Sequence, residues 1–291
     1  MSTIQKHLNF ATNQLNSVSD SARLDAEVLL AFVLKKNRSY LRAWHDKTLN
    51  TSTLALFESL ISQRLEGVTI AYITRSREFW SRDFIVSPDV LIPRPDTELL
   101  IELCLEEIPK DSTFEILDLG TGSGVIAITL AVERPKAKII AVDASAKALT
   151  IAQKNAKQHD CKNVQFILSD WFASVPAIQF DLIVSNPPYI SDDDKHLSQG
   201  DVRFEPKSAL ISAENGLRDI KIIAQQAKKH LTTDGQIWFE HGYNQALAVQ
   251  AILNELNYVN VQTYRDLAGQ LRATKASAPV DKIHLQVDCS P

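Results

Sequence analysis

The stretch FEILDLGTGSGVIAITLAVERPKAKIIAVD, residues 114–143, decides the fold of this chain. It begins with an apolar run that ends at Leu119, passes through a loop with three glycines, and continues as a helix-length apolar segment over residues 124–134. A second apolar run, residues 137–143, ends in Asp143. Short apolar runs separated by a helix are typical of parallel strands that are covered on both faces. The stretch therefore predicts a strand, a glycine loop, a helix and a second strand.

The same alternation continues along the chain on both sides of this stretch. Periodicity predicts helices at residues 96–108, 145–158, 217–231 and 245–256, and strands at residues 164–170, 180–186, 235–242 and 260–266. Alternating helices and strands predict an α/β fold with a doubly wound, mostly parallel sheet. The final segment, KASAPVDKIHLQVDCSP at residues 275–291, has no pattern that assigns it to an element.

The first part of the chain has a different pattern. Apolar residues recur at helical spacing in three segments between Ile4 and Ile61, which predicts a small helical unit. The segment EFWSRDFIVSPDVLI, residues 78–92, is rich in aromatic and β-branched residues and is typical of a hairpin connector. We therefore expect three parts in this order: a helical domain at residues 1–75, a β-hairpin at residues 76–93 and an α/β domain at residues 94–291.

Composition limits the classes of function. The chain has 291 residues, 45% of them hydrophobic, a net charge of −4 and a pI near 6.0, so general attraction to nucleic acid is not expected. The odd number of widely spaced cysteines, three in all, argues against a disulfide framework. The first residues lack the layout of a signal peptide, and no apolar run is long enough to span a membrane. We expect a cytoplasmic protein with no membrane partner.

The glycine loop and Asp143 together predict a nucleoside-containing cofactor. Glycines let the backbone approach a ligand closely, and an acid at the end of the next strand can accept both hydroxyl groups of a ribose. Asp143 follows Gly120 by 23 residues, the spacing typical of this arrangement. The G-x-G-x-G spacing differs from that of pyrophosphate-binding loops, and the chain has no G-x-x-x-x-G-K-[ST] loop. A nucleoside without phosphate fits best.

A second motif, Asn186-Pro187-Pro188-Tyr189, ends the apolar run that begins at residue 180. The prolines fix the backbone, remove two N–H donors and leave carbonyl groups available to a ligand. The amide oxygen of Asn186 and the carbonyl of Pro187 can accept two hydrogen bonds from a planar NH2 group, while Tyr189 packs on it. This chemistry needs neither a metal ion nor a covalent intermediate.

Both motifs resemble those of known methyltransferases. The segment DLGTGSG, residues 118–124, resembles motif I of class I enzymes that use S-adenosyl-L-methionine, and NPPY matches the [DNS]-P-P-[YFW] motif of methyltransferases that act on planar amino groups. The resemblance implies a seven-stranded Rossmann-like sheet. It places Trp171 beside adenine, although an aromatic residue there is nearly as typical of a core edge. The cofactor-binding residues it implies are Gly120, Thr121, Gly122, Ser123, Gly124, Asp143, Trp171 and Asn186.

Further segments resemble the HemK family of bacterial release-factor glutamine methyltransferases. They are RLDAEVLLAFVL, EFWSRDFIVSP, LIPRPDTELL, DVRFEPKSAL, FEHGYNQ and DLAG, and they span residues 20 to 272. The resemblance implies methylation of the glutamine side chain in the Gly-Gly-Gln tripeptide of peptide-chain release factors, with the helical domain docking the factor. It implies that residues 94–98 form part of the wall over the active site. The implied catalytic residues are Asn186, Pro187 and Tyr189, and the implied substrate-binding residues are Asn186, Pro187, Pro188 and Tyr189.

Three alternatives share some of these features. A ribosomal-protein glutamine methyltransferase has the same cofactor loop and NPPY motif, and only the docking domain separates it from the release-factor enzymes. A nucleobase amino-methyltransferase also uses NPPY, but the mildly acidic composition makes a nucleic-acid substrate less favoured. A non-catalytic adaptor could keep the cofactor fold and bind a translation factor, but the intact NPPY motif argues against it.

Overall fold

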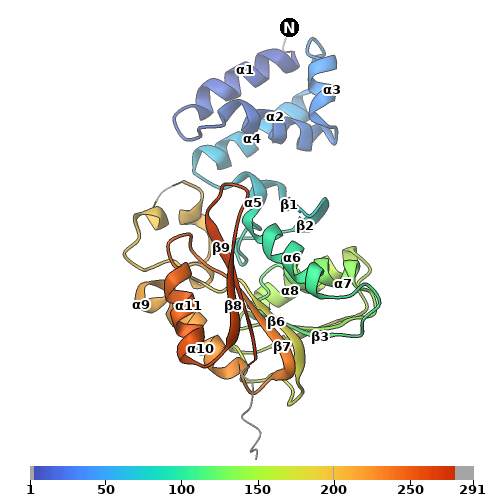
Figure 1. The fold of residues 1–291 in the computed structure, drawn as a ribbon. Helices are drawn as coiled ribbons and strands as arrows, with labels where there is room; N and C mark the ends of the chain where they lie inside the picture. The colour runs from blue at the N-terminus through green and yellow to red at the C-terminus, as the bar shows by residue number, and fades with distance from the viewer. Residues whose placement is uncertain (1–2, 199, 279–291) are drawn as a thin grey trace, which may run out of the picture. The chain divides into compact units, whose positions relative to one another are not determined.

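A computed structural model describes residues 3–198 and 200–278 of the chain (Figure 1). The chain divides into two compact units, and neither is continuous in sequence. The first, called here the helical unit, comprises Met1–Arg77, Val86–Pro88 and Lys195–Glu205. The second, called the sheet unit, comprises Glu78–Ile85, Asp89–Asp194 and Pro206–Pro291. The chain therefore passes between the two units several times.

The helical unit is built around one apolar core that its helices share. Asparagine or threonine side chains cap the first turn of four of its helices, as expected for residues that accept hydrogen bonds from free backbone N–H groups. The predicted helical N-terminal region is confirmed. Its helices are α1 (Ile4–Leu15), α2 (Ala22–Leu34), α3 (Arg38–Ala43), α4 (Thr51–Leu65) and α5 (Ile70–Thr74), and its short 3-10 helices are η1 (Lys195–Ser198) and η2 (Val202–Phe204).

Buried Arg64 attaches the segment Lys195–Glu205 to the helices of this unit. Its Nε lies 2.9 Å from Asp25 Oδ2 on α2, and its Nη1 lies 2.8 Å from Asp201 Oδ1. Close by in sequence, Gly67 has a φ of +98°, and the ring of Phe204 occupies the space that a Cβ atom on Gly67 would need. An ion pair and an aromatic contact therefore hold a segment that is more than 100 residues away in sequence.

Replacing Arg64 with alanine is expected to destabilise the helical unit by about 3–5 kcal/mol, because Asp25 would stay buried without its cation. Hydrogen exchange monitored by mass spectrometry measures this loss of stability, because amide hydrogens in peptides from α2 and α4 would lose protection. The matched control is Arg42→Ala, because Arg42 lies on α3 and is exposed. Equal protection of these peptides in both variants would contradict the structural role of Arg64.

A two-stranded hairpin follows the helices, as predicted. Strands β1 (Ser76–Phe79) and β2 (Arg82–Ile85) form a sheet of their own. Buried Asn155 on α8 (Ala146–Gln158) holds β2, because its Oδ1 accepts from Ile85 N at 2.7 Å and its Nδ2 donates to Ile85 O at 3.0 Å. The same Nδ2 also donates to Ser123 O at 2.8 Å, within the glycine loop. One amide therefore joins β2, α8 and the glycine loop.

The sheet unit contains the doubly wound, mostly parallel sheet of seven strands that the sequence predicts. The strand order is β5-β4-β3-β6-β7-β9-β8, in which the neighbours from β5 to β7 are parallel and β9 is antiparallel to both β7 and β8. The order reverses beside β3, and open parallel sheets bind ligands at such a point. The strands are β3 (Glu115–Leu119), β4 (Lys138–Asp143), β5 (Val164–Leu168), β6 (Phe180–Ser185), β7 (Leu231–Glu240), β8 (Val259–Arg265) and β9 (Leu271–Ser277).

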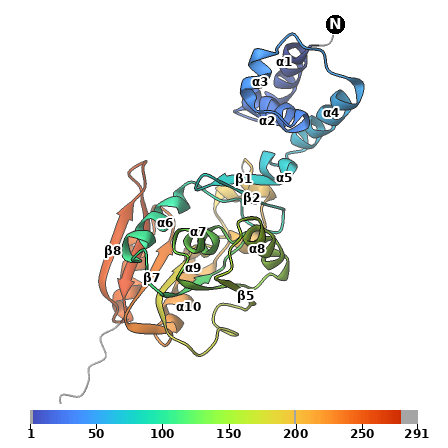
Figure 2. The same ribbon diagram turned by 90° about the vertical axis from the view of Figure 1, so that its right-hand side faces the viewer.

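Helices cover both faces of this sheet. Helices α6 (Asp96–Glu107), α7 (Val125–Glu133) and α8 lie on the face turned toward the viewer in Figure 2. Helices α10 (Arg218–Ala227) and α11 (Ala246–Glu255) lie on the opposite face. Each face has its own cluster of buried apolar side chains, so the sheet is covered on both sides. Two short elements, α9 (Ala213–Gly216) and η3 (Lys207–Ala209), precede α10.

The strand β9 is the main difference from the segments assigned by periodicity. It pairs with β7 and β8 and includes Lys275–Ser277, the first residues of the segment that the sequence left unassigned. Its buried side chains include Ala273, Thr274 and Ala276, which are small or polar and produce little hydrophobic signal. Residues 279–291 of that segment lie outside the described residues.

Two further sequence expectations concern cysteines and membranes. Cys104 and Cys161 are free thiols, and Cys289 lies outside the described residues. Among residues 3–198 and 200–278, no helix has the length and apolar character needed to cross a bilayer.

Candidate functional site

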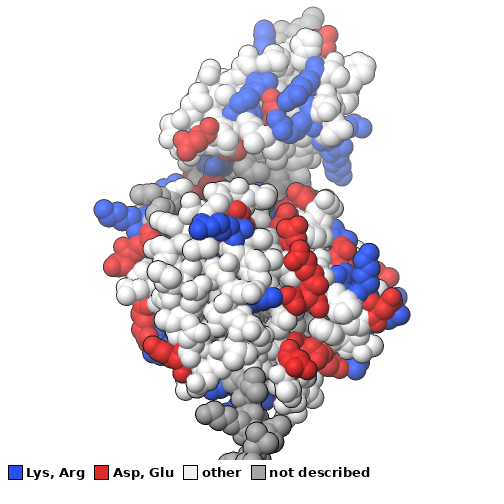
Figure 3. Space-filling model, in the orientation of Figure 1, with Lys and Arg blue, Asp and Glu red and all other residues white. Residues whose placement is uncertain are grey.

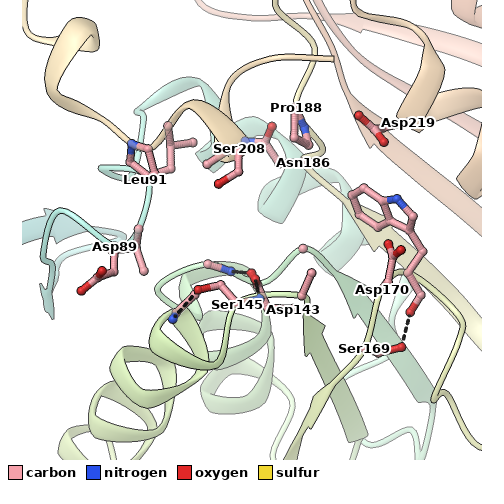
Figure 4. A pocket seen from close by; sticks show the side chains of 18 residues that line it. Asp89, Leu91, Asp143, Ser145, Ser169, Asp170, Asn186, Pro188, Ser208 and Asp219 are labelled. Carbon is pink, nitrogen blue, oxygen red and sulfur yellow. Dashed lines mark hydrogen bonds between the residues drawn. The ribbon is translucent and has the colours of Figure 1, made fainter. Parts of the chain in front are cut away.

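A cavity of about 400 Å³ lies at the carboxyl ends of strands β3, β4, β5 and β6, entirely within the sheet unit (Figure 4). In Figure 4, Asp143 and Ser145 lie on one side of the space, and Asn186, Pro188 and Ser208 lie across from them. The lining residues are Asp89, Val90, Leu91, Gly120, Gly122, Asp143, Ala144, Ser145, Ala148, Ser169, Asp170, Trp171, Asn186, Pro188, Pro206, Ser208, Ala209 and Asp219.

The glycine loop presents its backbone to this cavity. Gly120 and Gly122 line it, and both have positive φ angles, +74° and +57°. A Cβ atom on Gly120 would lie 3.4 Å from the ring of Trp171, whereas one on Gly122 would meet no atom within 4 Å. Glycine at these positions therefore keeps the space beside the backbone open for a ligand.

The other residues of the loop have structural surroundings. Thr121 and Ser123 are buried and do not line the cavity. Gly124 is the N-cap of α7 and has a φ of +85°, and a Cβ atom there would lie 2.7 Å from Ile128 Cδ1. Glycine at position 124 is therefore required by helix packing. The structure brings Gly120 and Gly122 to the cavity, whereas Thr121, Ser123 and Gly124 do not line it.

Asp143 ends β4 and faces the same cavity. Its Oδ2 accepts from Gly122 N at 2.9 Å, and its Oδ1 accepts from Ser145 N at 2.8 Å. Burial raises the pKa of Asp143, and these two backbone hydrogen bonds oppose the increase. Each carboxylate oxygen has a second lone pair, so the group can still accept hydrogen bonds from a pair of hydroxyls. Its orientation is fixed before any ligand binds.

Asp118 is a residue of the site to which the sequence analysis assigned no role. It is fully buried in β3, where its Oδ2 accepts from Thr121 Oγ1 at 2.6 Å and from Ala127 N at 3.2 Å. Burial raises its pKa most, the two hydrogen bonds lower it, and the charge of Asp143 raises it, so that the pKa is about 7. Asp118 thus supports the glycine loop from within the sheet. An acid between two leucines near the end of a buried strand was the sequence signal for it.

The two aromatic residues after β5 have different surroundings. Trp171 lines the cavity, and its carbonyl accepts from Ser169 Oγ at 2.8 Å in a tight turn where Trp171 has a φ of +45°. Phe172 is buried and stacks on His230 with 4.7 Å between ring centroids. Trp171 is therefore available to a ligand, whereas Phe172 belongs to the core.

The NPPY motif follows β6 and is held by residues from three other segments. Asn186 and Pro188 line the cavity, and Pro187 is buried. Asn186 Nδ2 donates to Thr97 Oγ1 on α6 at 3.1 Å, which leaves the amide oxygen for another partner. Tyr189 does not line the cavity, and its hydroxyl donates to Glu240 Oε1 at 3.2 Å.

The main chain at Tyr189 is held as closely as its side chain. Gln245 Nε2 donates to the Tyr189 carbonyl at 2.9 Å and to the Asn215 carbonyl at 3.0 Å. Gly216, with a φ of +81°, approaches the same carbonyl so closely that a Cβ atom on Gly216 would overlap it. Contacts to the side chain and to the backbone of Tyr189 therefore both hold the motif in position.

Several cavity residues are ones to which the sequence motifs gave no individual role. Leu91 lies in LIPRPDTELL, and Pro206, Ser208 and Ala209 lie in DVRFEPKSAL. None of residues 94–98 lines the cavity, although Thr97 contacts Asn186. The sequence signal that could have identified these cavity residues was their position in segments that carry the family resemblance. Among the described residues, no three His, Cys, Asp or Glu side chains are grouped to hold a metal ion.

The residues around the cavity fit S-adenosylmethionine. The volume is in the range of small-molecule sites, the backbone at Gly120 and Gly122 leaves room for close approach, and Asp143 presents acceptors for a ribose. The flat ring of Trp171 borders the same space. The combination of glycine backbone, acid and aromatic side chain is suited to a nucleoside with an attached amino acid.

Comparisons with known proteins agree with this arrangement. A family model described as "Methyltransferase small domain" matches residues 96–204, and one described as "PrmC N-terminal domain" matches residues 6–74. A crystal structure of a methyltransferase from Pyrococcus furiosus shares the fold, with a TM-score of 0.52 and 17% identity over 75% of this chain and 97% of that one.

Curated relatives extend the likeness over nearly the whole chain. A release factor glutamine methyltransferase from Vibrio cholerae is 50% identical over 94% of this chain and 96% of its own length. One from Shewanella oneidensis is 47% identical over 94% of this chain and 95% of its own length. The methyltransferase domain and the cavity together support S-adenosylmethionine as the cofactor. This chain therefore belongs to the family of release factor glutamine methyltransferases.

Proposed function

We propose that this chain transfers the methyl group of S-adenosylmethionine to the side-chain amide nitrogen of the glutamine in the Gly-Gly-Gln motif of peptide-chain release factors. The observation that carries the proposal is the orientation of Asn186. Its Nδ2 is engaged by Thr97, so its Oδ1 is free to accept a hydrogen bond at the cavity that also contains Asp143. The names of the curated relatives support glutamine as the acceptor.

We assign cofactor binding to Gly120, Gly122, Asp143 and Trp171. The backbone at the two glycines accommodates the methionine part, Asp143 accepts from the ribose hydroxyls, and Trp171 borders the adenine. When bound, the cofactor supplies an electrophilic methyl group on a sulfonium centre. Thr121, Ser123 and Gly124 support this region through the shape of the loop and make no contact with the cavity.

Asn186 and Pro187 orient the acceptor glutamine. An amide NH2 is a poor nucleophile because its lone pair is delocalised, and two acceptors on its two hydrogens raise the electron density on nitrogen and aim it. Asn186 Oδ1 and the Pro187 carbonyl are those acceptors. Holding the reacting nitrogen in line is worth up to about 7–11 kcal/mol in well-oriented reactions. Pro188 and Tyr189 pack around the planar amide.

Tyr189 acts as a packing group in this mechanism and does not serve as a base. Burial raises the pKa of its hydroxyl above the ordinary value, and the nearby charge of Glu240 raises it further. A phenol that keeps its proton throughout the physiological range cannot accept one from the amide. The proton of the acceptor nitrogen leaves after methyl transfer.

We also propose that the helical domain, residues 1–75, docks the release factor. Residues 1–77 carry ten Lys and Arg against six Asp and Glu, so this part is basic although the whole chain is acidic. Figure 3 shows that basic side chains outnumber acidic ones on the face of the helical unit that it presents. Exposed Phe10, Phe32 and Trp44 add apolar surface. Because the substrate is a translation factor, we place the reaction in the cytoplasm.

The test is methyl transfer from labelled S-adenosylmethionine to purified release factor, followed by mass spectrometry of the modified peptide. Label on the glutamine of Gly-Gly-Gln is the expected result, and a release factor with that glutamine replaced by alanine should stay unlabelled. Label on both proteins would refute the assigned acceptor. Label on ribosomal protein or nucleic acid in place of release factor would identify one of the alternative substrates.

A further inference from the structure

The end of strand β7 carries a buried carboxyl group to which the mechanism above assigns no role. Glu240 is the last residue of β7, and its side chain is 1% exposed. Strand β7 runs parallel to β6 with Phe239 opposite Ser185, so Glu240 and Asn186 each follow this pair by one residue. Burying a carboxyl group costs free energy unless hydrogen bonds compensate for the lost water. Its hydrogen-bond partners therefore indicate what it does.

Tyr189 is one partner. Its hydroxyl donates to Glu240 Oε1 at 3.2 Å, while Gln245 holds its carbonyl from the same segment, FEHGYNQ at residues 239–245. Glu240 thus controls the side chain of Tyr189, and Gln245 controls its backbone. Two residues of this segment therefore contact the NPPY motif.

Thr97 is the second partner. Its Oγ1 accepts from Asn186 Nδ2, and a threonine hydroxyl has a single hydrogen to donate. Burial raises the pKa of Glu240, and a side-chain hydrogen bond with Thr97 is the strongest of the effects that lower it. Asn186 therefore contacts Thr97 directly, and Thr97 acts on the same carboxyl group that accepts from Tyr189.

We propose that Glu240 is a positioning residue that keeps Asn186 and Tyr189 in the orientation that the acceptor amide requires, an inference that rests on the function proposed above. An ionised carboxylate can only accept hydrogen bonds. Thr97 must then donate to Glu240, and Thr97 Oγ1 must accept from the NH2 group of Asn186. Asn186 Oδ1 is left to face the acceptor nitrogen. Glu240 acts through Thr97 and Tyr189 and does not touch the substrate.

The ionised and protonated forms of Glu240 are both populated close to neutral pH. Burial raises the pKa of Glu240 most, the effects of Thr97, Arg272 and Tyr189 lower it, and Asp96 raises it, so that the pKa is about 7. Arg272 is shared, because it lies 3.4 Å from both Asp96 and Asp266. The titratable groups that face Glu240 are thus Arg272 from β9, Asp96 from α6 and Tyr189 from the loop after β6.

Protonation would reverse the direction of these hydrogen bonds. A protonated carboxyl group carries its own hydrogen, which competes with the hydrogens that Thr97 and Tyr189 donate. Because the pKa of Glu240 is raised, the protonated form gains population as the pH falls through about 7. We therefore expect kcat to decrease on the acid side of neutrality.

The decisive variant is Glu240→Gln, which keeps the size of the side chain but replaces one acceptor with an NH2 donor. We expect kcat for release-factor methylation to fall by about 10- to 100-fold, the usual effect of removing a supporting residue. The KM for release factor and the Kd for S-adenosylmethionine should stay unchanged, and the decrease of kcat below neutral pH should disappear. The matched control is Glu255→Gln on the exposed side of α11.

A second pair of variants tests the same inference if Glu240→Gln folds poorly. Thr97→Val removes the hydroxyl that connects Asn186 to Glu240, and Thr97→Ser keeps a hydroxyl at that position. We expect Thr97→Val to lose activity as Glu240→Gln does and Thr97→Ser to restore most of it. In the double variant the two losses should not add, because both break one chain of hydrogen bonds.

Two results would overturn the positioning role while leaving the proposed function intact. The first is that the decrease of kcat below neutral pH, seen in the wild type, persists in Glu240→Gln. The second is that Thr97→Val and Thr97→Ser have equal kcat. Failure of the proposed function has a different signature, since wild-type enzyme would then leave release factor unlabelled. A purely structural role for Glu240 would lower stability without changing the pH profile, which also counts against the inference.

Discussion

Asn186→Ala is expected to lower kcat for release-factor methylation by about 10²- to 10³-fold, the usual cost of removing one hydrogen-bonding group that acts in a transition state. The amide oxygen of Asn186 is the side-chain acceptor for the glutamine NH2, and alanine has none. The Kd for S-adenosylmethionine should change little, because the backbone of the glycine loop and Asp143 hold the cofactor. Single-turnover kinetics and calorimetric titration measure the two effects separately.

The matched control for this change is Asn254→Ala, since Asn254 is exposed on α11 and far in sequence from the motif. Its kcat should equal that of the wild type. Full activity in Asn186→Ala would refute the role of the amide. An equal loss of cofactor affinity and activity would show that Asn186 holds the cofactor and not the acceptor.

Asp143→Asn is expected to raise the Kd for S-adenosylmethionine by about 10- to 100-fold, because a hydrogen bond to a charged group is worth about 1.5–3 kcal/mol. Asparagine keeps one acceptor oxygen but places an NH2 group against a backbone N–H donor, either Gly122 N or Ser145 N. Calorimetric titration with S-adenosylmethionine and with S-adenosylhomocysteine should show the same increase, since both carry the ribose.

Saturating cofactor should restore most of the turnover of Asp143→Asn, because the acceptor-binding residues are unchanged. Asp160→Asn is the control, since Asp160 is exposed and its side chain forms an exposed ion pair with Lys162. A Kd for Asp143→Asn equal to that of Asp160→Asn would contradict the assignment of Asp143 to the ribose.

Periodicity predicted the helices and central strands well because both faces of the parallel strands are apolar. Strand β9 was missed because alternating polar and small residues, as at Arg272 and Ala273, carry little hydrophobic signal. The short helix α5 was missed for another reason, since its five residues are too few to establish a period. The start of β7 at Leu231 was assigned to the preceding helix, because an apolar residue fits either pattern.

For the site, the sequence predicted the residues that the motifs carry, and it placed Thr97 only within the expected wall at residues 94–98, without its contact to Asn186. Gly120, Gly122 and Asp143 stand at strand ends, where position alone indicates a ligand. Thr97 and Glu240 contact the NPPY motif through pairings that depend on which strands and helices are neighbours. Only the three-dimensional order of β6, β7 and α6 reveals these contacts. The roles assigned to all of these residues stay predictions until the variants are measured.

The attachment of Lys195–Glu205 to the helical unit has a consequence for how the chain is made. A ribosome synthesises the five N-terminal helices first, but Asp201, which pairs with buried Arg64, emerges about 137 residues later. By then β3, β4, β5 and β6 have already been synthesised. The helical unit therefore reaches its final form only after most of the parallel strands exist, so a fragment that ends at residue 77 would lack part of its own packing.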